Sequence, residues 1–300
     1  MKLSHLWLLL IAVIAASCSS QDPMQKEIAA LEQEVQENPE VDKAEELLEL
    51  YQEYIIRYPE NDDVNSRYLY RAAELQFRLN RISESIETLK QALRHHYEAE
   101  NTLNNALLLG ALYNDRVDNQ VLAQTVFQAT TIAFPNSEKA KQLTEEGLQP
   151  LDQRLQEMGK RVFNDSTGQI NYRAANNFIN GCAIHALILP GDEDTPDWLY
   201  KAAETSRSLR NYERGLQLYE WVFSEYPYHD RAAQALFLYA FTLDNDMERY
   251  QEAEVAYNRF LEQYPDSDFA DDAKFLLDNI GKDEEEIIRS FEERGSSDES

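Results

Sequence analysis

The sequence predicts an all-α protein built from stacked helical hairpins. Nine Gly and nine Pro in 300 residues are too few for the tight turns of an all-β chain. A hydrophobic content of 43% is enough to bury a large core. Near the C-terminus one pattern occurs twice, as Tyr212, Gly215, Tyr219, Tyr226 and Pro227 and again as Tyr250, Ala253, Tyr257, Tyr264 and Pro265. Every residue of the second copy follows its counterpart at one constant separation, that from Tyr212 to Tyr250, which we call the repeat interval.

Each copy of this pattern has the properties of a helix that packs closely against a partner. When the first aromatic residue is at position i, the small residue is at i+3 and the second aromatic residue at i+7. The small residue lets a neighbouring helix approach, with a ring on either side of the contact. The Tyr-Pro pair ends the helix, because the residue before proline is disfavoured in the α region. Such a hairpin cannot bury its apolar stripe alone and is predicted to dock on the next one.

These spacings resemble the tetratricopeptide repeat. In that pattern a small residue lies in the first helix, here Ala203, and an aromatic residue opens the second helix, here Tyr212, before Gly215, Tyr219 and the closing Pro227. The resemblance implies a right-handed superhelical solenoid of helix-turn-helix hairpins and is unspecific about activity.

The N-terminal part of the chain, residues 24–135, is predicted to contain three such hairpins. The first has a helix with Ile28, Leu31 and Val35 at helical spacing and a second helix over 42–57, closed by Tyr58-Pro59. The next two are expected at about 64–96 and 101–134. Pro59, Tyr97 and Pro135 again follow one another at the repeat interval.

The rest of the chain is predicted to be a divergent segment followed by two clear repeats. Residues 136–194 form a divergent hairpin or joint, in which 137–163 contain a kink or two shorter helices because Gly147 and Pro150 interrupt the pattern. Residues 195–280 contain the two clear hairpins and a capping helix at 268–279. Residues 281–300 are expected to form a short acidic helix over 283–293 and a frayed tail.

The N-terminus has the features of a lipoprotein signal. Residues 1–17 contain Lys2 and an apolar run from Leu6 to Ala16, too short to span a bilayer stably, so they are predicted to be a signal peptide. The sequence from Ala15 to Cys18 is similar to a bacterial lipobox, although Ala15 stands where that motif prefers Leu. The resemblance implies lipidation of Cys18 by palmitate or a similar acyl group, followed by a tether over 18–23, and Ser19 implies sorting to the outer membrane. An ordinary signal peptide with an incidental cysteine is the alternative.

Charge and motifs argue against nucleic-acid binding and against common catalytic sites. The net charge of −27 repels phosphate backbones and anionic lipids. The sequence has no phosphate loop, zinc-protease motif or nucleophile elbow. Cys182 with His185 offers two ligands where a metal site needs three or four, and the acidic run at Asp244, Asp246 and Glu248 lacks the residues that complete a calcium loop. We therefore predict no catalytic residue, no metal and no cofactor.

The family pattern places certain residues on the inner face of a solenoid, where partners bind. A groove that mixes aromatic, aliphatic and carboxylate side chains suits a helix or an extended peptide. Ordinary packing between repeats is the alternative. The candidate groove residues are Tyr70, Glu74, Phe77, Leu108, Leu112, Tyr200, Glu204 and Arg207.

These features favour a non-catalytic, lipid-anchored scaffold that faces the periplasm and binds other cell-envelope proteins or peptides. The chain resembles tetratricopeptide-repeat lipoproteins of the outer-membrane β-barrel assembly and cell-division coordination types, without a motif diagnostic of either. A lipoprotein that captures a glycan or peptide solute is the alternative function. The sequence does not name the partner or the oligomeric state.

Overall fold

The computed structural model describes residues 22–163, 168–282 and 286. The predicted signal peptide, Cys18, the tether up to residue 21 and most of the predicted acidic helix and tail lie outside these residues. The contacts divide the chain into two compact units, Met1–Glu60 and Asn61–Ser300. Each unit is described by itself.

The first unit is a single helical hairpin. It consists of α1 (Pro23–Glu37) and α2 (Val41–Arg57), joined by a loop of three residues. The apolar positions predicted for these helices form its core, with Ile28 and Tyr54 almost completely buried. Asp22 caps α1 by accepting from the backbone N–H of Met24, and it also accepts a hydrogen bond from the Tyr58 hydroxyl at 2.5 Å. The two ends of the hairpin are therefore tied together by one carboxylate.

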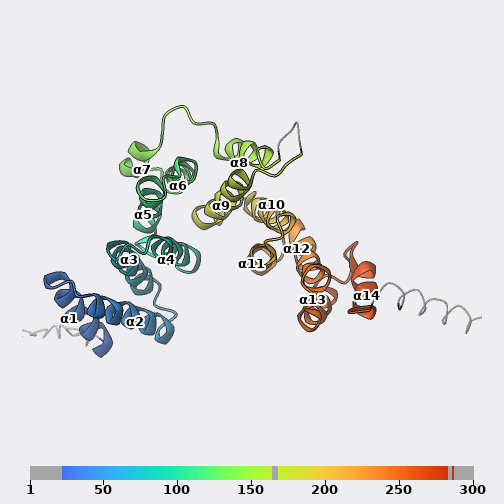
Figure 1. The fold of residues 1–300 in the computed structure, drawn as a ribbon, viewed down its shortest axis with the longest axis horizontal. Helices are drawn as coiled ribbons and strands as arrows, with labels where there is room; N and C mark the ends of the chain where they lie inside the picture. The colour runs from blue at the N-terminus through green and yellow to red at the C-terminus, as the bar shows by residue number, and fades with distance from the viewer. Residues whose placement is uncertain (1–21, 164–167, 283–285, 287–300) are drawn as a thin grey trace, which may run out of the picture. The chain divides into compact units, whose positions relative to one another are not determined.

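The second unit contains the remaining helices (Figure 1). Its helices are α3 (Asp62–Arg78), α4 (Ile82–His95), α5 (Thr102–Asp115), α6 (Gln120–Ala133), α7 (Glu138–Leu143), α8 (Leu151–Lys160), α9 (Tyr172–Ile188), α10 (Thr195–Ser208), α11 (Tyr212–Glu225), α12 (Asp230–Phe241), the π-helical turn η1 (Thr242–Asp246), α13 (Tyr250–Gln263) and α14 (Ala270–Asp278). They pack as the hairpins α3–α4, α5–α6, α8–α9, α10–α11 and α12–α13, with α14 against α13. Two short helices replace one long helix in 137–163, as predicted, and α14 lies where the capping helix was expected.

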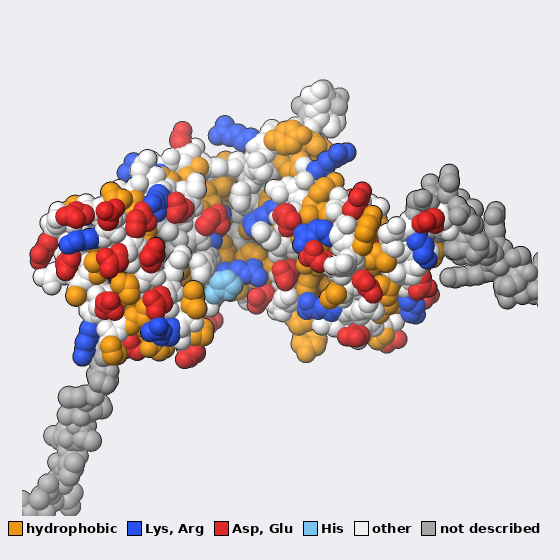
Figure 2. Space-filling view, turned by 60° about the horizontal axis from the view of Figure 1, so that its bottom comes forward, with side chains coloured by type: hydrophobic (Ala, Val, Ile, Leu, Met, Phe, Trp, Pro, Cys, Tyr) orange, Lys and Arg blue, Asp and Glu red, His pale blue; other side chains and the backbone are white. Residues whose placement is uncertain are grey.

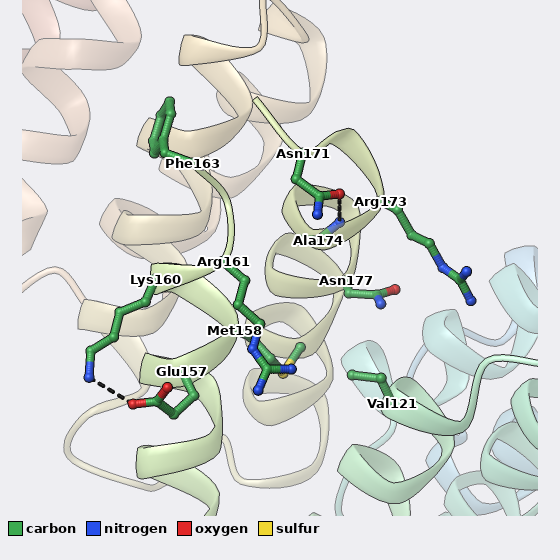
Figure 3. Close-up of a pocket in the computed structure, with 10 residues that line it drawn as sticks. All are labelled: Val121, Glu157, Met158, Lys160, Arg161, Phe163, Asn171, Arg173, Ala174 and Asn177. Carbon is green, nitrogen blue, oxygen red and sulfur yellow. Dashed lines mark hydrogen bonds and ion pairs between the residues drawn. The ribbon is translucent and has the colours of Figure 1, made fainter. Parts of the chain in front are cut away.

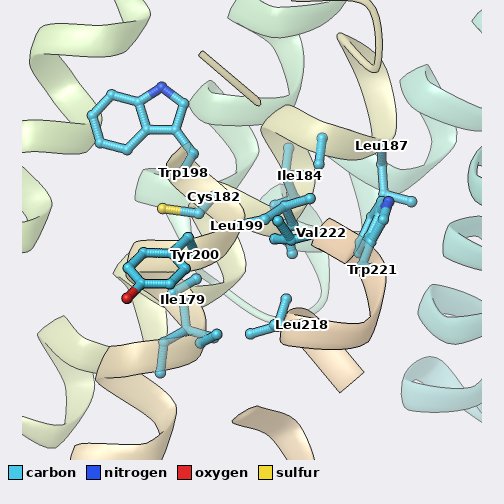
Figure 4. Packing of buried hydrophobic residues seen from close by; sticks show 14 of the residues in the cluster. Ile179, Cys182, Ile184, Leu187, Trp198, Leu199, Tyr200, Leu218, Trp221 and Val222 are labelled. Carbon is cyan, nitrogen blue, oxygen red and sulfur yellow. The ribbon is translucent and has the colours of Figure 1, made fainter. Parts of the chain in front are cut away.

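One hydrophobic core runs through the second unit from Ala73 to Ala273. The segment expected to be a divergent joint carries its most continuously buried helix, because every residue of α9 from Gly181 to Ile188 is buried. Figure 4 shows Ile184 of α9 beside Leu199 of α10, and the sulfur of Cys182 on the side of Trp198 and Tyr200. The degraded repeat pattern of α9 therefore reflects burial on several sides by α6, α8 and α10.

The second helices of the hairpins end in one common geometry. The helices α2, α4 and α6 end at Arg57, His95 and Ala133, which follow one another at the repeat interval. The residue that follows each of these helices, and each of α9, α11 and α13, has φ between −124° and −134°. This non-helical conformation ends the helix, and a proline, which disfavours the α region for the residue before it, follows in all of them except α4.

Tyrosine hydroxyls connect these helix ends to one another. The Tyr226 hydroxyl donates to the carbonyl of Pro190 at 3.0 Å, and the Tyr264 hydroxyl donates to that of Pro227 at 3.1 Å. The Tyr97 hydroxyl donates to the carbonyl of Ile188 at 2.8 Å. Each bond joins the end of one second helix to the end of another. Tyr226 and Tyr264 belong to the repeat motif, whereas Tyr97 stands at the position of the closing proline. The Ile188 carbonyl is in the last turn of α9, and the Pro190 and Pro227 carbonyls lie just after α9 and α11.

The turns before α4, α6, α11 and α13 share a left-handed residue two positions before the second helix. These residues are Asn80, Asp118, Arg210 and Glu248, with φ between 53° and 62°. Asn80 and Asp118 are separated by the repeat interval, and so are Arg210 and Glu248. Asn and Asp tolerate this conformation, whereas Arg and Glu adopt it at a cost.

The first helices do not follow the repeat interval. In the turn before α11, the N–H of Asn211 donates to the carbonyl of Ser206, and in the turn before α13 the N–H of Arg249 donates to that of Leu243. The two donors are one repeat interval apart, whereas the two acceptors are separated by one residue less than that interval. The bonds of Arg81 and Asn119, whose acceptors are Gln76 and Tyr113, differ in the same way. One extra residue therefore enters before the turn in both pairs of hairpins. In the C-terminal pair the π-helical turn η1 accommodates it, as a single inserted residue in a helix commonly does.

The small positions of the helix pairs lie in close contacts, as predicted. Gly215 faces the α10 backbone, where an added Cβ would lie 3.4 Å from the carbonyl oxygen of Ala203. Ala253 is fully buried, and so are Tyr219 and Tyr257. The prediction that Tyr250 packs in the interior was wrong, because its side chain is 41% exposed at the beginning of α13.

Candidate functional site: the face of the first helices

The candidate groove residues of α3 and α10 occupy equivalent places. Tyr70 and Tyr200 are each followed by a cation, two buried alanines and then an exposed glutamate, Glu74 or Glu204. The Tyr70 ring is half-buried, and Tyr200 is 8% exposed. Burial and then the charge of the neighbouring glutamate raise the pKa of each tyrosine, that of Tyr200 to about 12. Both first helices thus present a neutral phenol beside a carboxylate.

The assignment for α5 was wrong by one residue in its register. Leu112 is 2% exposed and occupies the core position of Leu75, which is 4% exposed. Since the first helices follow one another at one position less than the repeat interval, Glu74 corresponds to Ala111 and not to Leu112, and Phe77 corresponds to Asn114. Leu108 is half-buried but does not occupy the position of Tyr70. The extra residue before the α5–α6 turn accounts for the error.

The cations of this face are already paired with other side chains. The Arg207 Nε lies 2.5 Å from an Asp246 oxygen, and its guanidinium carbon is 5.0 Å from the centre of the Phe241 ring. Arg231 pairs with Asp197 at 2.6 Å and lies 4.8 Å over the Tyr200 ring.

In contrast, Glu74 and Glu204 have no ion pair among the residues that the structure describes. Both carboxylates are exposed, so they are open to a cation from a partner. Burial raises the pKa of the Glu204 carboxyl, and nearby cations oppose this shift.

A buried hydroxyl lies beneath the carboxylate of Glu204. Tyr219 of α11 is fully buried, its ring meets that of Tyr200 edge to face at 5.9 Å, and its hydroxyl has no hydrogen-bond partner in the described part of the chain. Burial and then the charge of Glu204 raise its pKa. The equivalent Tyr257 hydroxyl has the carboxylate of Asp244 at 3.4 Å.

Sequence reasoning missed the part of this face that α12 and η1 contribute. The shortened spacing of the first helices places Phe237 at the position of Tyr200, Phe241 at that of Glu204 and Asp244 at that of Arg207. The Phe237 ring stacks on Phe269 at 4.9 Å and lies 6.4 Å from Tyr257. The extra residue that η1 accommodates shifts the register of α12 by one residue, and a fixed period therefore hides these positions.

The other residues considered for chemistry have structural surroundings. Cys182 is fully buried, which raises the pKa of its thiol. His185 is 4% exposed and has the Thr195 hydroxyl 3.1 Å from Nδ1. Asp244 and Asp246 contact Tyr257 and Arg207. Within residues 22–163 and 168–282, no three His, Cys, Asp or Glu side chains are grouped so that they could hold a metal ion.

The surface of the chain mixes both charge signs with apolar side chains (Figure 2). Among the helices that the structure describes, none combines the length and the apolar content needed to cross a bilayer.

One repeat of the chain is identified by comparison with a known protein family. Residues 234–267 match the tetratricopeptide repeat family, over the end of α12, η1, α13 and the closing Pro265. The chain is similar to the solved structure titled "TPR2AB-domain:pHSP90-complex of yeast Sti1", with a TM-score of 0.32 and 13% identity, over 84% of this chain and 98% of that chain. No curated protein matches the chain. The protein thus has an all-α, tetratricopeptide-repeat-like fold with one repeat matched at residues 234–267.

Proposed function

We propose that the protein is a non-catalytic interaction scaffold whose first-helix face binds segments of partner proteins. The observation that carries this proposal is the equivalence of Tyr70 with Tyr200 and of Glu74 with Glu204. Both pairs present an exposed carboxylate without an ion pair next to an aromatic ring. Each carboxylate can pair with a Lys or Arg of a partner, and the half-buried ring of Tyr70 can also cover the aliphatic part of that side chain, whereas the ring of Tyr200 is already covered by Arg231.

The chemistry of the face also indicates where specificity arises. Arg207 and Arg231 are held by Asp246 and Asp197, so an incoming carboxylate would have to displace an existing ion pair. An incoming cation can pair with Glu204 without displacing an ion pair between described residues. The partner segment should therefore be basic and partly apolar, which agrees with the negative charge of the whole chain.

We further propose that the scaffold is anchored by a lipid on Cys18 to the periplasmic side of the outer membrane, where it binds other envelope proteins. Support comes from the sequence alone, in the apolar run that ends directly before Cys18. Labelling cells with a fatty-acid analogue should mark the wild-type protein and leave Cys18→Ser unlabelled. Separation of inner and outer membranes then tests the location. Equal labelling of both proteins would contradict the anchor.

The binding proposal is tested by reversing the two glutamates of the first-helix face. The full chain, solubilised in detergent, is used to capture partners after cross-linking in membranes, in the wild type and in Glu74→Arg/Glu204→Arg. The matched control is Glu254→Arg/Glu262→Arg, which makes the same charge change at exposed positions of α13.

Specific partners should be lost only from the first variant, with the circular-dichroism spectra of both variants unchanged. Equal loss from both variants would show that only net charge matters. Retention by both would exclude this face as the binding surface. Capture of a glycan or peptide solute in place of a protein would favour the alternative function of a solute-binding lipoprotein.

A further inference from the structure

One hairpin turn is much longer than the others. The turns between first and second helices contain three residues in α3–α4, α10–α11 and η1–α13, and four in α5–α6. Between α8 and α9 the connection runs over residues 161–171, and an isolated antiparallel bridge joins Phe163 to Ile170 at its base. Because the short turns suffice to close a hairpin, the additional length is not required by the fold, and long connections commonly carry function.

This turn borders a cleft of about 580 Å³ between α6, α8 and α9 (Figure 3). The side chains that line it come from the beginning of α6, the end of α8, the long turn and the beginning of α9. They are Val121, Glu157, Met158, Lys160, Arg161, Phe163, Asn171, Arg173, Ala174 and Asn177.

The cleft is cationic, in contrast to the chain as a whole. Three cations line it against one carboxylate, and Glu157 is already paired with Lys160 at 2.7 Å. The guanidinium groups of Arg161 and Arg173 are exposed and have no ion pair with any residue that the structure describes. Residues 154–173 contain four Lys and Arg against two Asp and Glu, in a chain with a net charge of −27.

Figure 3 shows Arg161 extending beside Met158 toward the α9 side of the cleft, while Lys160 turns to Glu157. The beginning of α9 and the end of α8 both border the cleft, and their partial charges have opposite signs, so the positive field comes from the guanidinium groups. Two arginines that have no ion pair with a described residue favour a carboxylate ligand, which a guanidinium group binds through two parallel hydrogen bonds.

The cleft also exposes apolar side chains. Phe163 is 51% exposed and Val121 is 38% exposed, and both line the cleft. Hydrophobic and Lys or Arg side chains meet on the surface beside the grey residues at the top of Figure 2. A small inorganic anion would leave these apolar surfaces in water, whereas a peptide would cover them.

We propose that this cleft binds an acidic segment of a partner protein, with carboxylates on Arg161 and Arg173 and an apolar side chain against Phe163. The site is separate from the first-helix face in residues and opposite in charge preference. The protein would then bind basic segments on one surface and acidic segments on the other.

The probe is a fluorescent peptide of four glutamates, two phenylalanines and two serines, titrated against the full chain in detergent. Fluorescence anisotropy should report saturable binding, weakened about tenfold or more by Arg161→Glu/Arg173→Glu. The matched control Arg67→Glu/Lys139→Glu makes the same charge change at exposed positions of α3 and α7 and should alter the affinity by no more than about twofold. Replacing Phe163 with Ala should weaken the binding of this peptide but should not change the binding of an analogue that lacks phenylalanine.

Circular dichroism checks that each variant folds, and Arg161→Gln/Arg173→Gln replaces the charge reversal if that variant does not. Binding that falls equally in the matched control would overturn the proposal, as would the absence of saturable binding. Glu74→Arg/Glu204→Arg should bind this peptide as the wild type does, so failure of the cleft and failure of the first-helix face give different results. In Glu74→Arg/Glu204→Arg, where the first-helix face no longer favours a cation, an analogue with lysines in place of glutamates should not bind, and binding as tight as that of the glutamate peptide would also overturn the proposal.

Discussion

Two glycines of the second unit should respond in opposite directions to the same substitution. A Cβ added at Gly215 would meet the Ala203 carbonyl oxygen at 3.4 Å and the Arg207 nitrogen at 3.5 Å, which are ordinary contacts. A Cβ added at Gly110 would lie 2.8 Å from two ring atoms of Phe127 and closer still to its Cε1. Phe127 is only 3% exposed, so its ring has little room to move.

The magnitudes follow from these contacts. Replacing glycine with alanine inside a helix stabilises it by about 1 kcal/mol through backbone entropy, and Gly215→Ala should gain up to this amount. At Gly110 every near ring atom must move to at least the 3.4 Å of an ordinary contact, and Cε1, which lies closer than 2.8 Å, must move farthest; overpacking of this kind costs about 1–3 kcal/mol. Gly110→Ala should therefore be destabilised by up to about 2 kcal/mol net, despite the same gain in helix propensity.

Urea denaturation followed by circular dichroism measures both changes. A double variant, Gly110→Ala with Phe127→Leu, tests the cause, because the smaller side chain makes room for the added methyl group. The loss of unfolding free energy in the double variant should be smaller than the sum of the losses in the two single variants, by about 1 kcal/mol or more. If Gly110→Ala were as stable as Gly215→Ala, the close approach of α5 and α6 described above would be incorrect.

Four further predictions concern the turns and the core. Arg210→Gly and Glu248→Gly should each stabilise the chain by roughly 0.5–1 kcal/mol, because glycine removes the left-handed strain at some cost in unfolded-state entropy, whereas Asn80→Gly should have almost no effect in the same urea assay. Ala253→Leu should cost about 1–3 kcal/mol by overpacking the α13 interface, and an unchanged midpoint would argue against the assigned helix pairing. Burial lowers the pKa of His185, so its contribution to stability is present above the unfolded pKa of about 6.5 and is lost as pH falls through the folded pKa. The unfolding free energy should therefore fall less between pH 7.5 and 5 in His185→Gln than in the wild type. In a Cys18→Ser background Cys182 should react with iodoacetamide only in denaturant, and rapid alkylation of the native protein would show that α9 is not packed as described.

The sequence carried most of the information about the second helices. Their ends could be predicted because a tyrosine, proline and small residue recur at fixed positions, and each acts through local backbone geometry or a close contact. The helix ends at Arg57, His95 and Ala133 confirm the repeat interval. The first helices carry weaker signals, since their register depends on how many residues the turn absorbs, and an extra residue before Asp118 or Glu248 is invisible to a fixed period.

The candidate site was predictable where the register was intact. Tyr70 with Glu74 and Tyr200 with Glu204 occupy equivalent places, but Leu112 belongs to the core. The cationic cleft could not be located from the sequence, because it depends on how α6, α8 and α9 meet around the long turn. The excess of Lys and Arg near Arg161 was the one available sign of it.

The hydrogen bonds from Tyr97, Tyr226 and Tyr264 have a mechanical consequence. Each joins the end of one second helix to a carbonyl at the end of another, so the ends of α4, α9, α11 and α13 are held together at this edge by hydrogen bonds that contribute about 1 kcal/mol each. Bending of the stack that keeps these bonds has to pivot about that edge, and the spacing of the repeats changes most at the opposite edge, which carries the turns. Those turns hold the left-handed residues and the π-helical segment, which are the parts of the backbone that deviate from regular helix. A ligand that spreads or closes the turns would therefore change the curvature of the second unit without breaking any of these tyrosine hydrogen bonds.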